Sequence, residues 1–133
     1  MFIYNVPRYI VVWYNIARCI NQEINMDTKI LQKKYLPLTE AAYYVLISLN
    51  KPRHGYGIMQ HVNEITNGRI NIGAGTMYGN LSRMEKEGLI TPVAEESRKK
   101  VYELSEKGKA VQKLELERLE ELLSLGKTEI GDS

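Results

Sequence analysis

The chain has 133 residues, of which 44% are hydrophobic and 26% are charged, and its formal net charge is only +2. These values are typical of one small globular domain with appended helices, and so weak a charge does not by itself indicate nucleic-acid binding. The longest apolar run near the start, Tyr9 to Tyr14, is too short for a membrane span or a secretion signal. A single cysteine, Cys19, excludes an intrachain disulfide, so the sequence favours a reducing cytoplasm.

The first predicted element is an amphipathic helix over residues 5–25. Pro7 suits the first position of a helix, and Asn5 suits the cap before it. Apolar side chains then recur at helical spacing along one stripe, namely Ile10, Trp13, Tyr14, Ala17, Ile20 and Ile24. Such a stripe more commonly packs against another helix or a partner subunit than against a membrane surface. Cys19, near the apolar side, is therefore predicted to be packed, and the polar residues 25–34 are predicted to be a linker.

Three short helices are predicted next, over residues 39–50, 56–66 and 75–87. Thr39 caps the first of them, and Pro52 prevents its continuation. A turn at residues 54–57 opens the second, and Gly88 follows the third, where a left-handed residue is needed. In the second and third helices, inward-facing side chains repeat at i, i+4 and i+7, namely Ile58, Val62 and Ile65, then Met77, Leu81 and Met84. Residues 69–72 could form one short strand.

A hairpin and a long helix complete the chain. Residues 89–95 and 99–105 are predicted as two strands, with residues 96–98 at the tip. Ser105 caps a helix that continues to about Leu125 and is ended by Gly126, before a polar tail over residues 127–133. The leucines of this helix cover more than one face, which predicts a partner as well as its own domain. The predicted dimerisation residues are Leu114, Leu119, Leu122 and Leu123.

This order of elements predicts a mainly α fold with a small β-hairpin wing. It is the arrangement of a winged helix-turn-helix, here with dimerisation helices at both ends. We assign residues 1–35 to an N-terminal extension, residues 36–105 to a DNA-binding domain, residues 106–126 to a C-terminal dimerisation helix and residues 127–133 to a tail. The sequence leaves Met26 open as an alternative start of translation.

The third helix of the DNA-binding domain is predicted to read the bases. One helix is narrow enough for the major groove of DNA, a second braces it, and the hairpin reaches a phosphate strand. The residues predicted for this surface of the helix are small or able to hydrogen-bond, namely Gly75, Thr76, Tyr78, Gly79, Asn80 and Arg83. The wing carries Arg98, Lys99 and Lys100, which suit a phosphate contact that is indifferent to base sequence. Two-fold symmetry would place two such helices about one DNA turn apart, so the expected operator is an inverted repeat.

Plainer interpretations of these residues remain open. A run of charges at a hairpin tip is often only solvated. Thr76 and Asn80 could serve for capping and surface polarity alone. A winged helix can also act as a protein-interaction module without binding DNA, in which case the third helix would show an apolar patch.

Other candidate sites are weaker. Tyr43, Tyr44 and Tyr56 are predicted at the edge of the core, with an effector cavity as the alternative. The spacing of His54, His61 and Cys19 does not favour a metal site. No nucleophile–base pair, phosphate loop or carboxylate pair has a spacing that predicts an enzyme, and no cofactor is expected.

From about Leu36 to Leu125, the chain resembles the PadR family of bacterial regulators. The resemblance rests on several motifs in the expected order: His54-Gly55-Tyr56-Gly57, Gly75-Thr76-Met77-Tyr78, Leu81-Ser82-Arg83-Met84-Glu85, Glu87-Gly88-Leu89-Ile90, and Tyr102-Glu103-Leu104-Ser105 with Gly108. With one C-terminal helix, the chain is similar to the short branch of that family.

The resemblance implies a homodimeric winged-helix repressor. Its last helix would swap against the partner subunit, and a small aromatic or lipophilic effector would release it from DNA. The resemblance also implies DNA contacts by Thr76, Tyr78 and Asn80 on the third helix and by Lys99 and Lys100 on the wing. The last helix has no tryptophan on which a flat compound could stack, so the identity of the effector stays open.

Overall fold

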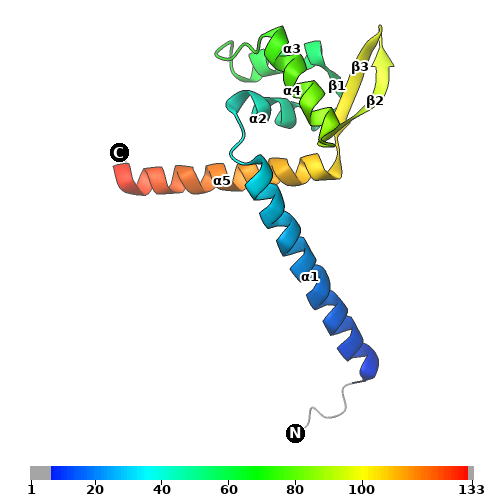
Figure 1. Cartoon of the computed structure of the whole chain (residues 1–133). Helices are drawn as coiled ribbons and strands as arrows, with labels where there is room; N and C mark the ends of the chain where they lie inside the picture. The colour runs from blue at the N-terminus through cyan, green and yellow to red at the C-terminus, as the bar shows by residue number, and fades with distance from the viewer. Residues whose placement is uncertain (1–6, 132–133) are drawn as a thin grey trace. The chain divides into compact units, whose positions relative to one another are not determined.

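The computed structural model describes the backbone of residues 7–131 and the side chains of residues 7–19 and 27–131. The chain divides into two compact units, residues 1–34 and residues 35–133. Figure 1 labels the elements of the second unit, which are α2 (Glu40–Ser48), β1 (Arg53–His54), α3 (Gly55–Ile65), α4 (Ala74–Lys86), β2 (Ile90–Glu96), β3 (Lys99–Leu104) and α5 (Glu106–Ile130).

One uninterrupted helix, α1 (Arg8–Tyr35), runs through the described part of the first unit. The predicted linker over residues 25–34 is therefore wrong. This segment contains no glycine or proline, and helix formers such as lysine, glutamine and leucine keep a polar segment helical. The helix ends next to Leu36, whose backbone is restricted by the following proline. The predicted cap Asn5 and the side chains of Ile20 and Ile24 lie outside the described residues.

Most apolar side chains on the described part of α1 are exposed, although Leu31 is half-buried and Tyr35, in the last turn, is buried. Those with large exposed surfaces include Tyr9, Ile10, Val11, Val12, Trp13, Tyr14, Ile16 and Ile30. Cys19 is exposed as well, so the prediction of a packed thiol is wrong for the single chain. The physical reason is that α1 is the only helix described in its unit.

The second unit is the predicted winged helix-turn-helix, with its core between α2, α3, α4 and the start of α5. The helix α2 contacts each of the other three. Thr39 caps it as predicted, since the threonine Oγ1 accepts a hydrogen bond from the Ala42 amide at 3.1 Å. The inward stripes of α3 and α4 are buried as predicted, except that Ile65, in the last turn of α3, is exposed.

A three-stranded antiparallel sheet lies beside these helices, in the order β1-β3-β2. The hairpin of β2 and β3 is the predicted wing (Figure 1). Its tip is formed by Ser97 and Arg98, which both have positive φ angles, of 48° and 66°. Such left-handed pairs match the twist of the strands in a tight hairpin. The sequence missed β1, because a strand of two residues is too short to show an alternating pattern.

Two further predicted boundaries are wrong. Residues 69–72 form a loop and not a strand, and a side chain holds the loop in place, since Thr66 Oγ1 accepts from the Ile70 amide at 3.1 Å. The helix α5 continues through Gly126 to Ile130, so residues 127–130 are helical and not a frayed tail. A glycine inside an exposed helix costs only about 1 kcal/mol, which the neighbouring helix formers can offset.

The start of α5 is fixed against the junction between α4 and β2. Gly88 has the predicted left-handed conformation, with a φ angle of 76°. Ser105 Oγ donates to the Gly88 carbonyl at 2.6 Å and accepts from the Gly108 amide at 3.0 Å. A Cβ on Gly108 would lie 2.0 Å from the Leu89 carbonyl oxygen. The backbone of α5 therefore meets the α4–β2 junction so closely that only glycine fits.

Alanine at Gly108 should destabilise the protein, because its Cβ would overlap a backbone oxygen that cannot move aside alone. We expect Gly108→Ala to lower the free energy of unfolding by about 3 kcal/mol. The matched control is Gly126→Ala in the same helix, where nothing lies within 4 Å of the added Cβ, and it should raise stability by roughly 0.5–1 kcal/mol. Urea titration followed by circular dichroism measures both, and equal stability of the two variants would contradict this packing.

Candidate nucleic-acid interface

The helix α4 has one buried face and one polar face. Met77, Leu81 and Met84 are at most 1% exposed, and they attach α4 to the core. Of the residues predicted to contact DNA on this helix, five are exposed and Asn80 is half-buried; the exposed five are Gly75, Thr76, Tyr78, Gly79 and Arg83. The helix thus presents small and hydrogen-bonding side chains outward while it is held from behind.

The N-terminus of α4 is open. Its cap residue is Gly73, so no side chain caps the helix, and a Cβ on Gly73 or Gly75 would meet nothing within 4 Å. The first amide groups of a helix have no partner inside the helix and carry a partial positive charge. An uncapped and uncrowded N-terminus of this kind is suited to an anion such as a DNA phosphate.

The polar side chains on α4 hold one another along the helix. Asn80 Nδ2 donates to the Thr76 carbonyl at 2.9 Å, and an Arg83 guanidinium nitrogen donates to Asn80 Oδ1 at 3.2 Å. These contacts order the Asn80 amide and the Arg83 guanidinium on the surface before any ligand arrives. Both groups retain donors that can reach outward.

The start of α3 packs tightly against α4. A Cβ on Gly55 would lie 2.8 Å from a ring carbon of Tyr78, so the glycine allows α3 to approach the tyrosine ring. His54 caps α3, since its Nδ1 accepts a hydrogen bond from the Gly57 amide at 2.9 Å. This capping role of His54 was missed at the sequence level.

The described residues hold no cluster of three or more possible metal ligands.

The three wing cations occupy different settings. Arg98 is exposed in the turn. The Lys99 ammonium lies 5.2 Å from the ring centroid of Tyr56 on α3, and the Lys100 Nζ lies 3.4 Å from Glu85 Oε1 on α4. The wing is therefore tied to both helices of the helix-turn-helix.

Acidic residues offset part of the charge of the wing. Across the hairpin, Glu96 lies opposite Lys99 and Glu95 lies opposite Lys100 in the strand register. The local charge is thus less positive than the run of three cations suggests. Sequence reasoning missed Tyr56 and Glu85 as neighbours of the wing, because both come from helices far from the hairpin along the chain.

Tyr102 connects the wing to α4. Burial raises the pKa of the Tyr102 phenol, the negative charge of Glu85 raises it further, and Lys100 opposes the rise. With its pKa raised above the usual value of 10.0, the phenol stays protonated at neutral pH. It therefore adds no negative charge next to the wing lysines.

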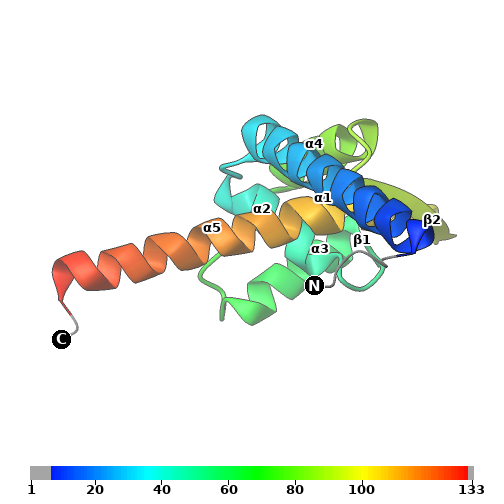
Figure 2. The same cartoon turned by 90° about the horizontal axis from the view of Figure 1, so that it is seen from below.

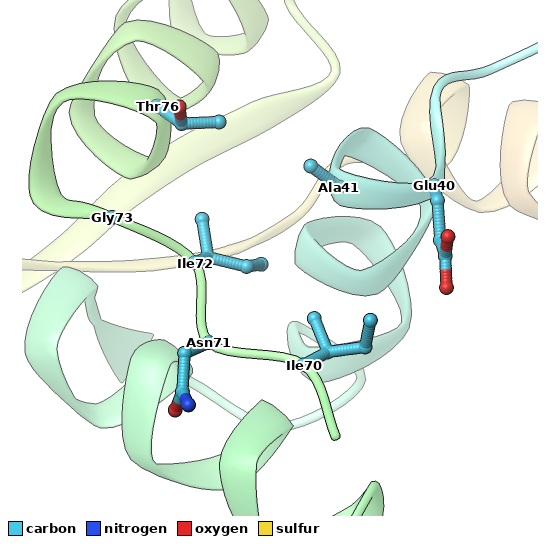
Figure 3. A pocket seen from close by; sticks show the side chains of 7 residues that line it. All are labelled: Glu40, Ala41, Ile70, Asn71, Ile72, Gly73 and Thr76. Atoms are coloured by element: carbon cyan, nitrogen blue, oxygen red, sulfur yellow. The ribbon is translucent and has the colours of Figure 1, made fainter. Parts of the chain in front are cut away.

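A shallow pocket of about 310 Å³ opens beside the start of α4. Figure 3 shows that it lies between the first turn of α2, the loop over residues 70–73 and the first turn of α4. Its lining includes Ala41, Ile72 and Thr76. None of the three tyrosines considered for an effector cavity lines this pocket: Tyr43 and Tyr44 are half-buried, and Tyr56 is exposed.

The helix α5 changes character along its length. Its first half packs on the domain, where Gln112 donates to the Leu46 carbonyl at 3.1 Å and Leu114 is only 8% exposed. The buried carboxylate of Glu115 accepts two hydrogen bonds from Arg118, at 2.7 and 2.8 Å. Beyond this pair Leu119 is still half-buried, and the apolar side chains that follow are exposed, as in Leu122 at 52% and Leu123 at 59%.

This change divides the four predicted dimerisation leucines. Leu114 is part of the core of its own chain, and Leu119 is half-buried. Leu122 and Leu123 are exposed. The C-terminal part of α5 extends beyond the other elements of the second unit (Figures 1 and 2). Most of the free apolar surface of the helix therefore lies in its second half, with Leu116 at 46% exposure as the addition from the first half.

Comparison with known proteins identifies the family. Residues 45–114 match the transcriptional regulator PadR-like family. The chain belongs to the PadR-like family. This family consists of transcriptional regulators, so the chain is a DNA-binding regulator of the winged-helix type. No curated protein sequence matches it at a significant level.

Solved structures share the fold. A PadR family transcription regulator from Clostridium difficile is 23% identical over 70% of this chain and 100% of that one, with a TM-score of 0.61. A PadR-like transcription factor from Bacteroides fragilis is 23% identical over 84% of this chain and 99% of that one, with a TM-score of 0.55. A transcriptional regulator from Clostridium thermocellum is 21% identical over 66% and 87%, with a TM-score of 0.59. Among the described residues, no helix is long and apolar enough to cross a membrane.

Proposed function

We propose that this PadR-like regulator is a cytoplasmic, sequence-specific repressor that binds an inverted-repeat operator as a homodimer. The observation that carries the proposal is the polar outer face of α4, which combines an uncapped N-terminus with the ordered side chains of Asn80 and Arg83. Release by a small aromatic or lipophilic effector is the mode of control that the family resemblance favours.

The two DNA-facing parts are suited to different tasks. Thr76, Asn80 and Arg83 carry donors and acceptors that can distinguish base edges in the major groove. Arg98, Lys99 and Lys100 on the wing can bind phosphates, which adds affinity without sequence preference. An interaction module without DNA binding would need an apolar outer face on α4, and the exposed residues of α4 are small or polar apart from Tyr78.

A second copy of the chain is the partner that α5 favours. The exposed leucines at positions 122 and 123 lie beyond the contacts with the domain, and apolar helix faces of this kind are commonly buried in homodimers. A two-fold dimer also supplies the second recognition helix that an inverted repeat requires.

Selection of bound duplexes from a random DNA pool tests the whole proposal. The wild-type protein should enrich an inverted repeat whose half-sites are about one helical turn apart. Asn80→Ala should change the preferred base at one position of each half-site, at a cost of about 1–3 kcal/mol in discrimination. A protein that enriches no sequence, or an Asn80→Ala variant that weakens all duplexes equally, would contradict base reading by this residue.

Removal of the wing charges should weaken binding to every duplex alike. We expect Arg98→Ala, Lys99→Ala and Lys100→Ala together to reduce the slope of log affinity against log salt by about 2–3, because each lost phosphate contact is worth about 0.9. The control removes three cations from α5, with Lys109→Ala, Lys113→Ala and Lys127→Ala. Fluorescence anisotropy at several salt concentrations measures both, and an unchanged slope in the wing variant would count against the phosphate contacts.

Polar substitutions at the exposed leucines should separate the dimer. Four leucines are lost per dimer in Leu122→Gln with Leu123→Gln, and each buried leucine is worth about 1.5–3 kcal/mol. At the lower value the four leucines contribute about 6 kcal/mol, so the dimer dissociation constant should rise by about ten-thousandfold or more. Glu120→Gln with Glu121→Gln on the same turn is the control and should remain dimeric. Sedimentation equilibrium gives the masses, and an unchanged mass for the leucine variant would exclude this interface.

A further inference from the structure

The two lysines of the wing are neighbours on β3, yet they contact different partners. Successive side chains of a strand point to opposite faces. Lys99 accordingly lies over the Tyr56 ring on α3, and Lys100 lies against Glu85 on α4. Each lysine is thus held by a helix of the DNA-binding domain.

These two contacts have different electrostatic consequences. An aromatic ring attracts an ammonium group through its quadrupole but leaves the net charge at +1. A carboxylate attracts it and cancels that charge. Glu96 and Glu95 lie opposite the two lysines across the hairpin, so the difference between them comes from the helices. Lys99 makes no ion pair among the described residues and keeps its charge for a phosphate, whereas Lys100 is paired with Glu85 in the free protein.

Helix stability does not account for an acid at position 85. Glu85 lies in the last turn of α4, where the helix dipole favours cations and disfavours carboxylates. Its side chain is 30% exposed, compared with 60% for Lys100, so the carboxylate is the less solvated member of the pair. The negative charge of Glu85 also raises the pKa of the Tyr102 phenol on β3. The Glu85 carboxylate therefore lies close to the wing as well as on α4.

We propose that Glu85 competes with DNA phosphate for Lys100. In the free protein, the carboxylate holds the lysine against α4. On DNA, a phosphate replaces it, and Glu85 is left without its partner. Glu85 therefore lowers the affinity for duplexes of every sequence, and the affinity that remains depends more on the base contacts of α4. This inference rests on the proposed function, since it assigns a residue that tunes the same interface.

The test compares two carboxylates at the same end of α4. Glu85→Gln keeps the shape of the side chain and frees Lys100. Glu87→Gln removes the same charge two residues away, and the Glu87 carboxylate makes no ion pair among the described residues. Dissociation constants for one random-sequence duplex and one selected duplex are measured by fluorescence anisotropy at low salt, after thermal melts have established that both variants fold.

Glu85→Gln should bind both duplexes about two- to fivefold more tightly than the wild type, the range expected for one exposed ion pair. Glu87→Gln should have a smaller effect. With Lys100→Met as background, Glu85→Gln should have no more effect than Glu87→Gln, because the competition needs the lysine.

Two results would overturn this inference and leave the proposed function intact. One is an equal change in DNA affinity for Glu85→Gln and Glu87→Gln, and the other is a gain in affinity from Glu85→Gln that persists in the Lys100→Met background. A wild-type protein that binds neither duplex would instead overturn the proposed function, and this inference with it.

Discussion

The DNA-binding unit depends on the burial of one stripe of α4. Met77, Leu81 and Met84 are almost wholly removed from solvent, and side chains of this size each contribute about 1.5–3 kcal/mol when buried. This anchoring decides which side of the helix faces outward. The other positions of α4 carry glycines, hydroxyl groups, an amide and a guanidinium. The packing of this one stripe therefore completes the core and at the same time exposes the polar face of α4.

Much of the fold follows from local signals in the sequence. Thr39 and Ser105 cap helices where a hydroxyl precedes an apolar repeat, and Gly88 ends α4 in the left-handed conformation. The sequence also shows which face of α4 is buried, since its repeat has the period of a helix. These features depend on residues within one or two turns of each other, and sequence patterns report such relations well.

Most of the errors come from relations that are not local, and the linker predicted at residues 25–34 is an exception. A polar composition suggested a linker at residues 25–34, but a helix without glycine or proline does not end merely because it is polar. The strand β1 exists because Arg53 and His54 pair with Tyr102 and Val101, far along the chain. The contacts of Tyr56 with Lys99 and of Glu85 with Lys100 depend in the same way on how the hairpin returns to the helices.

The ion pair between the buried Glu115 and the partly exposed Arg118 lies near the point where α5 leaves its own domain. Up to this pair the helix contributes apolar side chains such as Val111 to the core, and from Leu122 onward its leucines are exposed. Glu115 is only 1% exposed, and its carboxylate accepts two hydrogen bonds from the Arg118 guanidinium. These two hydrogen bonds persist only while Arg118 stays in its place one turn along the helix. Removing Arg118 would leave the buried carboxylate without its partner, which is costly. Both residues belong to α5, so the pair stabilises the helix itself, and the direction in which α5 leaves the domain is set by the packing of its first half through residues such as Val111 and Leu114.

That direction matters for DNA binding, because α5 connects the proposed dimer contact to the recognition helix. The start of α5 contacts Leu89, in the junction between α4 and β2, without room for a single Cβ. A dimer formed through the second half of α5 would thus set the spacing of two α4 helices through rigid contacts and not through a flexible linker. A ligand that shifts α5 by even a fraction of a helical turn would change that spacing, and with it the fit to two half-sites on one face of the duplex.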